Sequence, residues 1–246
     1  MPTRWGLFEV IGYERDISNC TQQVETALAI VLGDLTESSP LVRVHSQCFT
    51  GEILGSLRCD CNDQLTMAMQ AIAEEGRGVV IYEYQEGRGI GLMAKLQAYE
   101  LQDVGIDTVE ANHALGFTAD CRDFSLAAAI VHNLGVTRVR LLTNNPRKAR
   151  ALSHAGIEIV ARVSCEARAT PHSISYLRTK KRKMGHALTF PQHPGIRGEE
   201  SADLAEGAPD LEQRSGSLDE TFTLLCGEHG RAIDAGGRVC GIEAQL

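Results

Sequence analysis

The sequence predicts an α/β (α+β) protein in which helices flank a mixed sheet, and three observations indicate this. Runs typical of strands alternate with runs typical of helices over residues 1–190. Polar and glycine-rich motifs follow several of the expected strands. Residues 191–246 differ in composition, with 11 acidic and 4 basic residues and 9 of the 24 glycines. We therefore expect one domain over 1–190 and a largely disordered acidic tail over 191–246.

In the first half of the domain, apolar and β-branched runs predict strands, and glycine, serine or proline marks their ends. The expected strands are 1–16 (an early strand or hairpin), 25–33, 40–45 and 78–84. The last of these reads GVVIYEY and lacks alternation, as in strands buried on both faces. Apolar residues at helical spacing predict a helix over 62–75 that ends at Gly76.

The second half continues the alternation of helices and strands. A glycine-rich loop at 85–91 precedes an expected helix from about Leu92 to Val104, and a further helix is expected over 123–134. Asn145 and Pro146 form the typical start of a helix that closes at Gly156. Expected strands flank that helix at 138–143 and 157–163, and a basic helix follows at about 174–187.

Composition excludes several classes of protein. The chain has 246 residues, 43% hydrophobic and 23% charged, with no apolar run long enough for a membrane span and no apolar stretch typical of a signal peptide. The net charge of −8 lies mostly in the tail, so residues 1–190 are nearly neutral and show no basic face for nucleic acid. We expect a cytoplasmic protein that binds neither nucleic acid nor membrane and has no need of disulfides.

Three of the eight cysteines, Cys48, Cys59 and Cys61, lie within 14 residues. Three thiolates with one open position are the composition of a catalytic zinc site, where a bound water loses its proton easily. Two alternatives remain at this point. The cysteines can be small buried residues on strands, or His45 can complete a structural site with four ligands.

Two further motifs lie at the ends of expected strands, where α/β proteins bind ligands. In Gln85–Gly91 (QEGRGIG), glycines let backbone amides approach an oxyanion, and Arg88 can bind phosphate. In Thr143–Lys148 (TNNPRK), Thr143 and Lys148 can face a phosphate or a base. The alternatives are a tight strand-to-helix turn for the first motif and a capped helix with solvated basic residues for the second.

Two shorter motifs complete the candidate set. Asp120 and Arg122 lie one residue apart on a loop and can act on one substrate, or form a surface ion pair or a capping turn. In RVHS, Arg43 and His45 share one face of a strand, either toward a ligand or at a half-buried edge.

Taken in order, these motifs resemble the GTP cyclohydrolase II family, whose zinc enzymes open the guanine ring of GTP at the start of riboflavin synthesis. The resemblance covers about residues 4–188. The matching stretches are RVHSQC, SLRCDCNDQL, IYEYQEGRGIGL, KLQAYELQDVGIDTVEANHALGFTADCRDF, VRLLTNNPRKARAL and YLRTKKRKMGHAL.

The resemblance assigns roles to particular residues. It implies zinc ligands at Cys48, Cys59 and Cys61, a proton acceptor at Asp120, a nucleophile toward the α-phosphate at Arg122, and a tyrosine beside the guanine at Tyr99. It implies GTP contacts at Arg43, Val44, His45, Ser46, Gln47, Gln64, Glu86, Gly87, Arg88, Thr108, Thr143 and Lys148. It also implies a homodimer, with Mg²⁺ accompanying the triphosphate. Because guanidinium is almost always protonated, Arg122 can instead stabilise the phosphoryl charge.

The expected reaction releases formate and diphosphate and leaves 2,5-diamino-6-(5-phosphoribosylamino)pyrimidin-4(3H)-one. Three positions depart from the family pattern, which has Glu at Gln47, Gly at Asn62 and Arg at Tyr84. These departures keep alternatives open: a paralogue that serves a secondary-metabolite pathway, an enzyme that stops at the formylated pyrimidine, and a GTP-binding protein without catalysis.

Overall fold

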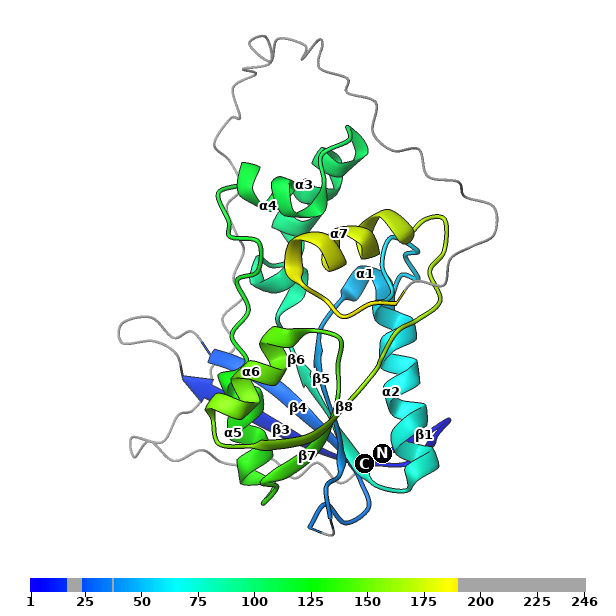
Figure 1. The fold of residues 1–246 in the computed structure, drawn as a ribbon, viewed down its shortest axis with the longest axis vertical. Coiled ribbons are helices and arrows are strands. Elements are labelled where there is room, and N and C mark those ends of the chain that lie inside the picture. Colours follow the sequence, from blue (N-terminus) through cyan, green and yellow to red (C-terminus); the bar gives the residue numbers. More distant parts are fainter. Residues whose placement is uncertain (17–23, 37, 190–246) are drawn as a thin grey trace, which may run out of the picture. The chain divides into compact units, whose positions relative to one another are not determined.

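The computed structural model describes residues 1–16, 24–36 and 38–189, and these form a mixed sheet with helices on both faces (Figure 1). The predicted α/β class is therefore confirmed. The predicted tail over 191–246 lies outside the described residues. Among the described helices, none has the length and apolar character needed to cross a membrane.

The sheet has six strands in the order β3-β4-β6-β5-β7-β8. Their bounds in chain order are β3 (Glu9–Asp16), β4 (Val24–Leu32), β5 (Leu41–Ser46), β6 (Gly78–Glu83), β7 (Arg138–Leu142) and β8 (Glu158–Val163). β3 and β6 pair antiparallel with β4, whereas β5, β6, β7 and β8 run parallel to one another. The carboxyl ends of four parallel strands therefore meet at one edge of the sheet. A small hairpin, β1 (Pro2–Thr3) and β2 (Gly6–Leu7), precedes the sheet.

Alternation along the strands divides the core between the two faces of the sheet. On β6, Val79 and Ile81 face a cluster that includes α5 (Ser125–Asn133) and α6 (Pro146–His154). Val80 faces the opposite cluster, which includes residues of α2 (Cys61–Glu75). Burial of β6 on both faces agrees with its continuous apolar sequence.

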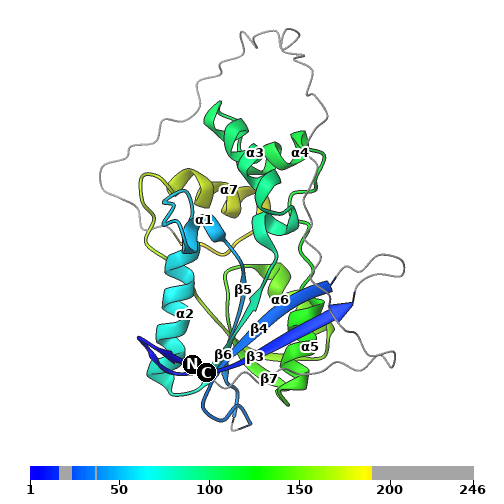
Figure 2. The ribbon, with the colours of Figure 1, turned by 180° about the vertical axis from the view of Figure 1, so that it is seen from behind.

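Four helices lie beyond the carboxyl edge of the parallel strands in both views (Figures 1 and 2). They are α1 (Phe49–Glu52), α3 (Leu92–Asp103), α4 (Thr108–Ala114) and α7 (Ile174–Met184). The short 3-10 turn η1 (Glu86–Gly89) connects β6 to this group. These helices and the strand ends enclose the candidate site.

Most predicted elements are found within two or three residues of their expected bounds. Gly76 ends α2 in a left-handed conformation with φ 77°, as its position predicts. Asn145 caps α6, and its side chain accepts a hydrogen bond from the backbone of Arg147. The basic helix is shorter than expected because Gly185 turns left-handed, with φ 64°, directly after Met184. α1 and α4 are additional helices that we do not predict.

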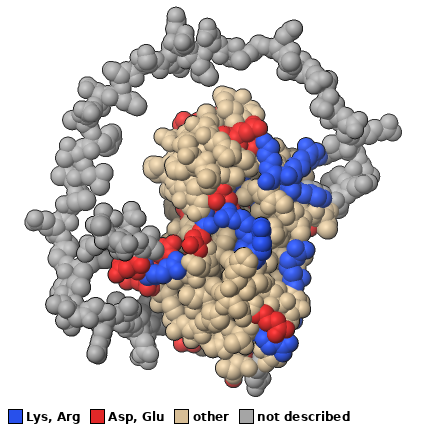
Figure 3. Space-filling model, turned by 60° about the vertical axis from the view of Figure 1, so that its left-hand side comes forward, with Lys and Arg blue, Asp and Glu red and all other residues tan. Residues whose placement is uncertain are grey.

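Basic side chains do not form one continuous surface on the face in Figure 3. They lie in separate patches, most of them beside acidic side chains. Exposed ion pairs such as Arg58–Asp103 and Lys183–Glu110 also bring opposite charges together at the surface.

Candidate active site

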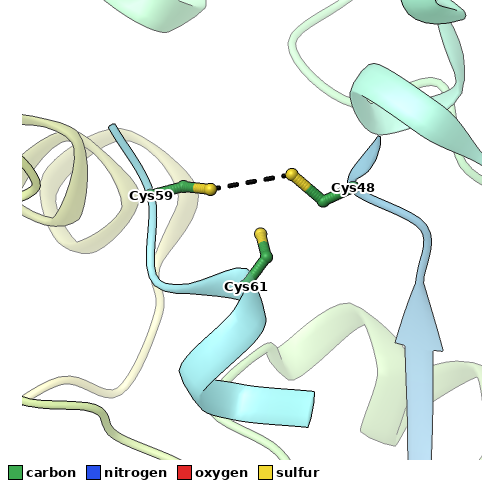
Figure 4. A group of neighbouring side chains, drawn as sticks. All are labelled: Cys48, Cys59 and Cys61. Atoms are coloured by element: carbon green, nitrogen blue, oxygen red, sulfur yellow. Dashed lines mark hydrogen bonds between the residues drawn. The ribbon is translucent and has the colours of Figure 1, made fainter. Parts of the chain in front are cut away.

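Cys48, Cys59 and Cys61 converge from two elements at the carboxyl edge of the sheet (Figure 4). Cys48 lies two residues after the end of β5 and directly before α1, whereas Cys59 lies just before α2 and Cys61 is the first residue of that helix. The three sulfur atoms lie within 4.8 Å of one another, and the Cys48 and Cys59 sulfurs are 3.6 Å apart. Within the described ranges these cysteines are all free.

The cluster fits a zinc ion held by three thiolates. Tetrahedral Zn–S bonds of about 2.3 Å place sulfur atoms about 3.8 Å apart, close to the observed separation. Gly51 provides room for the cluster, because a Cβ there would lie 2.9 Å from the Cys59 sulfur and 3.2 Å from the Cys48 sulfur. His45 does not complete the set, since its Nε2 is hydrogen-bonded to Glu52 at 2.9 Å. The three cysteines therefore leave the fourth coordination position of a tetrahedral zinc ion open.

A buried lysine balances the charge of the thiol cluster. Lys95 donates from Nζ to the Cys48 sulfur at 3.2 Å and to Glu86 at 2.7 Å. Hydrogen bonds with Cys59 and Cys61, together with the Lys95 ammonium, hold the pKa of the Cys48 thiol well below its ordinary value. Burial acts to lower the pKa of Lys95, but Glu86 and Cys48 raise it above its ordinary value. Cys48 is therefore held as a thiolate.

The glycine-rich loop brings two motifs together. Gly87 and Arg88 are both left-handed, with φ values of 60° and 63°, so the chain makes the tight turn given above as an alternative. Gly89 has φ 88°, and a Cβ there would lie 3.1 Å from the carbonyl carbon of Cys121, so any other residue would strain the backbone and crowd Cys121. The Arg88 carbonyl accepts a hydrogen bond from the Cys121 amide at 3.0 Å. The loop therefore fixes the position of the Asp120–Arg122 segment.

Asp120 and Arg122 form a buried two-point ion pair rather than a surface pair. Arg122 donates from Nε and Nη2 to the two Asp120 oxygens, each at 2.8 Å, and Arg147 approaches Asp120 at 2.9 Å. Burial alone would raise the pKa of Asp120, but these cations lower it. Burial alone would lower the pKa of Arg122, but Asp120 raises it. Both groups are therefore ionised.

β5 and α2 hold a second group of polar side chains. Arg43 donates to Gln64 Oε1 at 2.7 Å and to the Leu142 carbonyl at 3.1 Å. His45, on the same face as Arg43, is buried, and burial lowers its pKa to about 4. Both predicted residues therefore face inward from β5, rather than lying at a half-buried strand edge.

Lys148 is buried, although the alternative interpretation of its motif predicts a solvated residue. Its Nζ donates to the Val44 carbonyl at 2.9 Å and lies 3.4 Å from Ser46 Oγ. Burial, together with Arg122 and Arg43, places the pKa of Lys148 well below its ordinary value. Lys148 lies in the first turn of α6, the helix that Asn145 caps.

Two adjoining cavities contain nearly all the predicted residues. The first, here called the thiol pocket, has a volume of about 650 Å³, part of it open to solvent. Its predicted residues are Ser46, Gln47, Cys48, Cys59, Cys61, Glu86, Gly87, Arg88, Tyr99, Thr108 and Arg122. The second, here called the cationic pocket, has a volume of about 550 Å³. Its predicted residues are Arg43, His45, Ser46, Cys61, Gln64, Arg88, Arg122, Thr143 and Lys148.

Ser46, Cys61, Arg88, Arg122 and Tyr176 line both pockets, so the two are continuous. Two predicted residues do not line either pocket. The Val44 side chain lies in the core, and only its carbonyl reaches Lys148. The Asp120 carboxylate contacts the site through Arg122.

Several buried polar residues of the site are not predicted. Lys95 precedes Tyr99 by one helical turn, and this spacing is a signal that could have identified it. Glu83 ends the buried strand β6 and pairs in register with Ser46, yet neither carboxyl oxygen has a side-chain hydrogen-bond partner among the described residues. Burial raises its pKa to about 7, against the lowering effect of Lys148 and Arg122. Lys180 and His186, which line the cationic pocket, have no signal in the sequence beyond their basic character.

The departures from the family pattern lie in different places. Gln47 lines the thiol pocket, and its backbone amide donates to the Glu83 carbonyl at 2.8 Å. Asn62 is in the first turn of α2. Tyr84 is 49% exposed and packs edge-on against Tyr82, and it lines neither the thiol pocket nor the cationic pocket. Of the three, Gln47 is the one whose side chain bears on the pockets.

Comparison with known sequences agrees with this geometry. A profile of the family described as GTP cyclohydrolase II matches residues 1–164. The GTP cyclohydrolase-2 of Enterobacter sp. (strain 638) is 53% identical over 190 residues, which cover 77% of this chain and 94% of that protein. The GTP cyclohydrolase-2 of Shigella boydii serotype 18 is 53% identical over 189 residues, covering 76% and 94%.

A longer relative and one solved structure are also similar in part. Riboflavin biosynthesis protein RibBA of Salinispora arenicola is 51% identical over 192 residues, covering 77% of this chain and 44% of that protein. A two-domain 3,4-dihydroxy-2-butanone 4-phosphate synthase from A. baumannii matches 68% of this chain and 38% of its own, with 22% identity. Its TM-score of 0.36 is too low to bear on the fold. The profile match and the near-complete coverage of close relatives show that this chain is a hydrolase of the GTP cyclohydrolase II family.

Proposed function

We propose that this enzyme hydrolyses GTP in riboflavin biosynthesis, with the product expected above. The imidazole ring opens, formate and diphosphate leave, and 2,5-diamino-6-(5-phosphoribosylamino)pyrimidin-4(3H)-one remains. Relatives named GTP cyclohydrolase-2 and riboflavin biosynthesis protein support this substrate and pathway.

One observation carries the proposal: a cluster of three thiols and a cluster of cations share one continuous cavity. Cys61 lines both pockets, and Arg43, Arg88, Arg122 and Lys148 line the cationic pocket. In a purine nucleoside triphosphate, the ring to be hydrolysed lies at one end of the molecule and the negatively charged phosphates lie at the other. The thiol pocket suits the ring to be hydrolysed, and the adjoining cationic pocket suits the phosphates.

Cys48, Cys59 and Cys61 would hold zinc at the ring end of the substrate. Zinc bound there supplies an activated water at neutral pH for attack on guanine C8. Lys95 contributes by donating a hydrogen bond to the Cys48 sulfur, which favours the thiolate. Tyr99, which lines the thiol pocket and whose hydroxyl lies 3.1 Å from Thr50 Oγ1, would contact the guanine ring.

Asp120 and Arg122 would act at the junction of the two pockets. The ionised Asp120 accepts a proton once substrate draws Arg122 away from it, because its low pKa depends on that ion pair. Arg122 then stabilises charge on the α-phosphate as a cation. Its raised pKa favours this role over that of a nucleophile.

The remaining predicted residues would bind GTP directly, with Val44 contributing through its backbone alone because its side chain lies in the core. They are Arg43, His45 and Ser46 on β5, then Gln47, Gln64, Glu86, Gly87, Arg88, Thr108, Thr143 and Lys148. No carboxylate lines the cationic pocket among the described residues. Mg²⁺ would therefore be held by phosphate oxygens and water, as it usually is in nucleotide sites.

The experiment incubates zinc-loaded protein and Mg²⁺ with GTP and follows formate, diphosphate and product mass. Formate with the deformylated pyrimidine is the expected result. A product that retains the formyl group would show an enzyme that stops earlier, and tight GTP binding without turnover would show a binding protein. The riboflavin role is tested separately, by rescue of a riboflavin-requiring strain that lacks its own cyclohydrolase.

We also propose a cytoplasmic homodimer, as the resemblance implies. Exposed apolar side chains in the 53–57 loop, with Ile53 at 70% and Leu54 at 66% exposure, offer surface that a partner could cover. Light scattering on the purified chain measures the mass, and a monomer at micromolar concentration would contradict the dimer.

A further inference from the structure

The segment after β8 folds back over the carboxyl edge of the sheet and forms one wall of the cationic pocket. It lies beyond residue 164, where the family profile ends. Tyr176, Lys180, Met184 and His186 from this segment line the pocket. None of them is among the GTP contacts that the sequence predicts.

Contacts with three other parts of the molecule hold this wall in place. Lys180 pairs with Asp60 at the start of α2, with Nζ 3.2 Å from Oδ1. Lys183 pairs with Asp107 and Glu110 of α4. The Ala187 amide donates to the Asn144 carbonyl at 3.0 Å. The side chains that line the pocket are therefore positioned before any ligand arrives.

His186 is the residue of this wall whose hydrogen bonds are incomplete. It is 8% exposed, and its buried Nδ1 has no hydrogen-bond partner among the described residues. Burial, together with the nearby Lys180 and Arg122, lowers the pKa of His186 to about 3. The imidazole is therefore neutral, and in the tautomer with a proton on Nδ1 it has a hydrogen bond to donate.

Two other donor nitrogen atoms on residues of the cationic pocket are also left unpaired within the described part of the chain. Arg43 Nε and Arg88 Nη2 are buried and have no hydrogen-bond partner among the described residues. Buried donors are rarely left unpaired, because losing a hydrogen bond costs about 1–3 kcal/mol. Three such atoms around a pocket lined by five basic side chains fit a ligand with several anionic oxygens. The five are Arg43, Arg88, Arg122, Lys148 and Lys180.

We propose that His186 and Lys180 are substrate-binding residues that contact the triphosphate of GTP, so that the segment after β8 completes the site. This inference rests on the proposed function. His186 donates a hydrogen bond from Nδ1 to a phosphate oxygen, and Lys180 contributes a fixed positive charge. Tyr176 is a positioning residue, because its ring lies under both Arg88 and Lys180, at 5.6 Å and 5.1 Å.

The test compares ligands that carry phosphates with a ligand that lacks them. Affinities of zinc-loaded wild type, His186→Ala and Lys180→Gln are measured by calorimetry for GTP, inorganic triphosphate and guanosine. Hydrogen bonds to charged groups predict roughly tenfold weaker binding of GTP and inorganic triphosphate in each variant. Guanosine affinity should be unchanged. His186→Asn, which keeps a donor, should recover part of the loss.

Arg182→Gln is the matched control for Lys180→Gln, since it removes the same charge from an exposed position on the same helix. Unchanged zinc content and melting temperature in the variants exclude simple loss of structure. Equal weakening of guanosine and GTP, or no weakening of either, would overturn the inference.

The outcome is separable from that of the proposed function. If wild type releases formate from GTP while the variants keep wild-type KM, the function stands and the inference fails. If wild type does not turn over GTP but binds inorganic triphosphate in a manner that depends on His186, the anionic site stands and the proposed reaction fails.

Discussion

Glu83 places a buried carboxyl group in register with Ser46, a residue that lines both pockets. Because burial raises its pKa from 4.5 to about 7, the folded state binds a proton more tightly there than the unfolded state does. The folded state therefore loses stability as the pH rises from about 4.5 to about 7.

Glu83→Gln should remove this dependence. The stability of wild type relative to the variant should fall with rising pH, by up to about 3 kcal/mol across that window. Urea unfolding of both proteins at several pH values measures it. Glu9→Gln, which removes an exposed carboxylate from strand β3, controls for the change in net charge. Parallel stability curves for wild type and Glu83→Gln would contradict the prediction.

The thiol cluster gives a second prediction for single residues. Cys61→Ser should lower bound zinc from one ion per chain toward zero, since two thiolates hold the ion far less well than three. Gly51→Ala should also weaken zinc binding, because its Cβ would meet the Cys59 sulfur at 2.9 Å.

Zinc content after dialysis against a chelator measures both effects. Cys121→Ser and Gly12→Ala are the controls, as Cys121 is exposed outside the cluster and a Cβ on Gly12 meets nothing within 4 Å. Full zinc retention in Cys61→Ser would show that the cluster does not hold the metal.

Among the helices, α6 links a capping residue to a residue of the site. The Asn145 side chain accepts a hydrogen bond from the Arg147 amide at 2.9 Å, and Lys148 lies in the same first turn. Asn145→Ala should lower the free energy of unfolding by about 1 kcal/mol and raise KM for GTP, because the first turn frays. Asn145→Ser, which restores a cap, should recover stability. Denaturation and steady-state kinetics measure the two effects, and unchanged KM despite lost stability would separate the cap from the site.

Prediction from sequence succeeds where an element has a local signal. The apolar run of β6, the glycine that ends α2 and the cap of α6 are local, and all three are found. α4 is missed because seven residues are too few for clear periodicity, although its cap Asp107 is a signal.

For the site, motifs identify residues close in sequence, but not their partners. The pairing of Lys95 with Cys48, across 47 positions, depends on tertiary packing. The same holds for the burial of His186 and for the placement of Lys148 and Arg122 near Glu83, which no local pattern encodes. Resemblance to a family supplies the predicted residues without showing which buried charges surround them.

At the scale of the whole molecule, the predicted residues run from Arg43 to Lys148 and the proposed additions extend to His186, all within the described part of the chain. A chain shortened to residues 1–189 should therefore keep turnover within about twofold and keep its zinc. A chain shortened to 1–164 should lose stability and activity, because it lacks the buried Leu177 and Leu188 as well as the wall of the cationic pocket. Calorimetric melting and formate release measure both, and full activity in the shorter chain would contradict the prediction.

The place of β5 in the sheet order has a consequence for synthesis on the ribosome. β5 lies between β6 and β7, so one neighbour follows soon after it in the chain and the other only at residues 138–142. Until those residues leave the exit tunnel, the nascent chain presents an open strand edge beside the apolar Val42 and Val44. Chaperone binding to stalled nascent chains should therefore be strongest between completion of β6 and completion of β7.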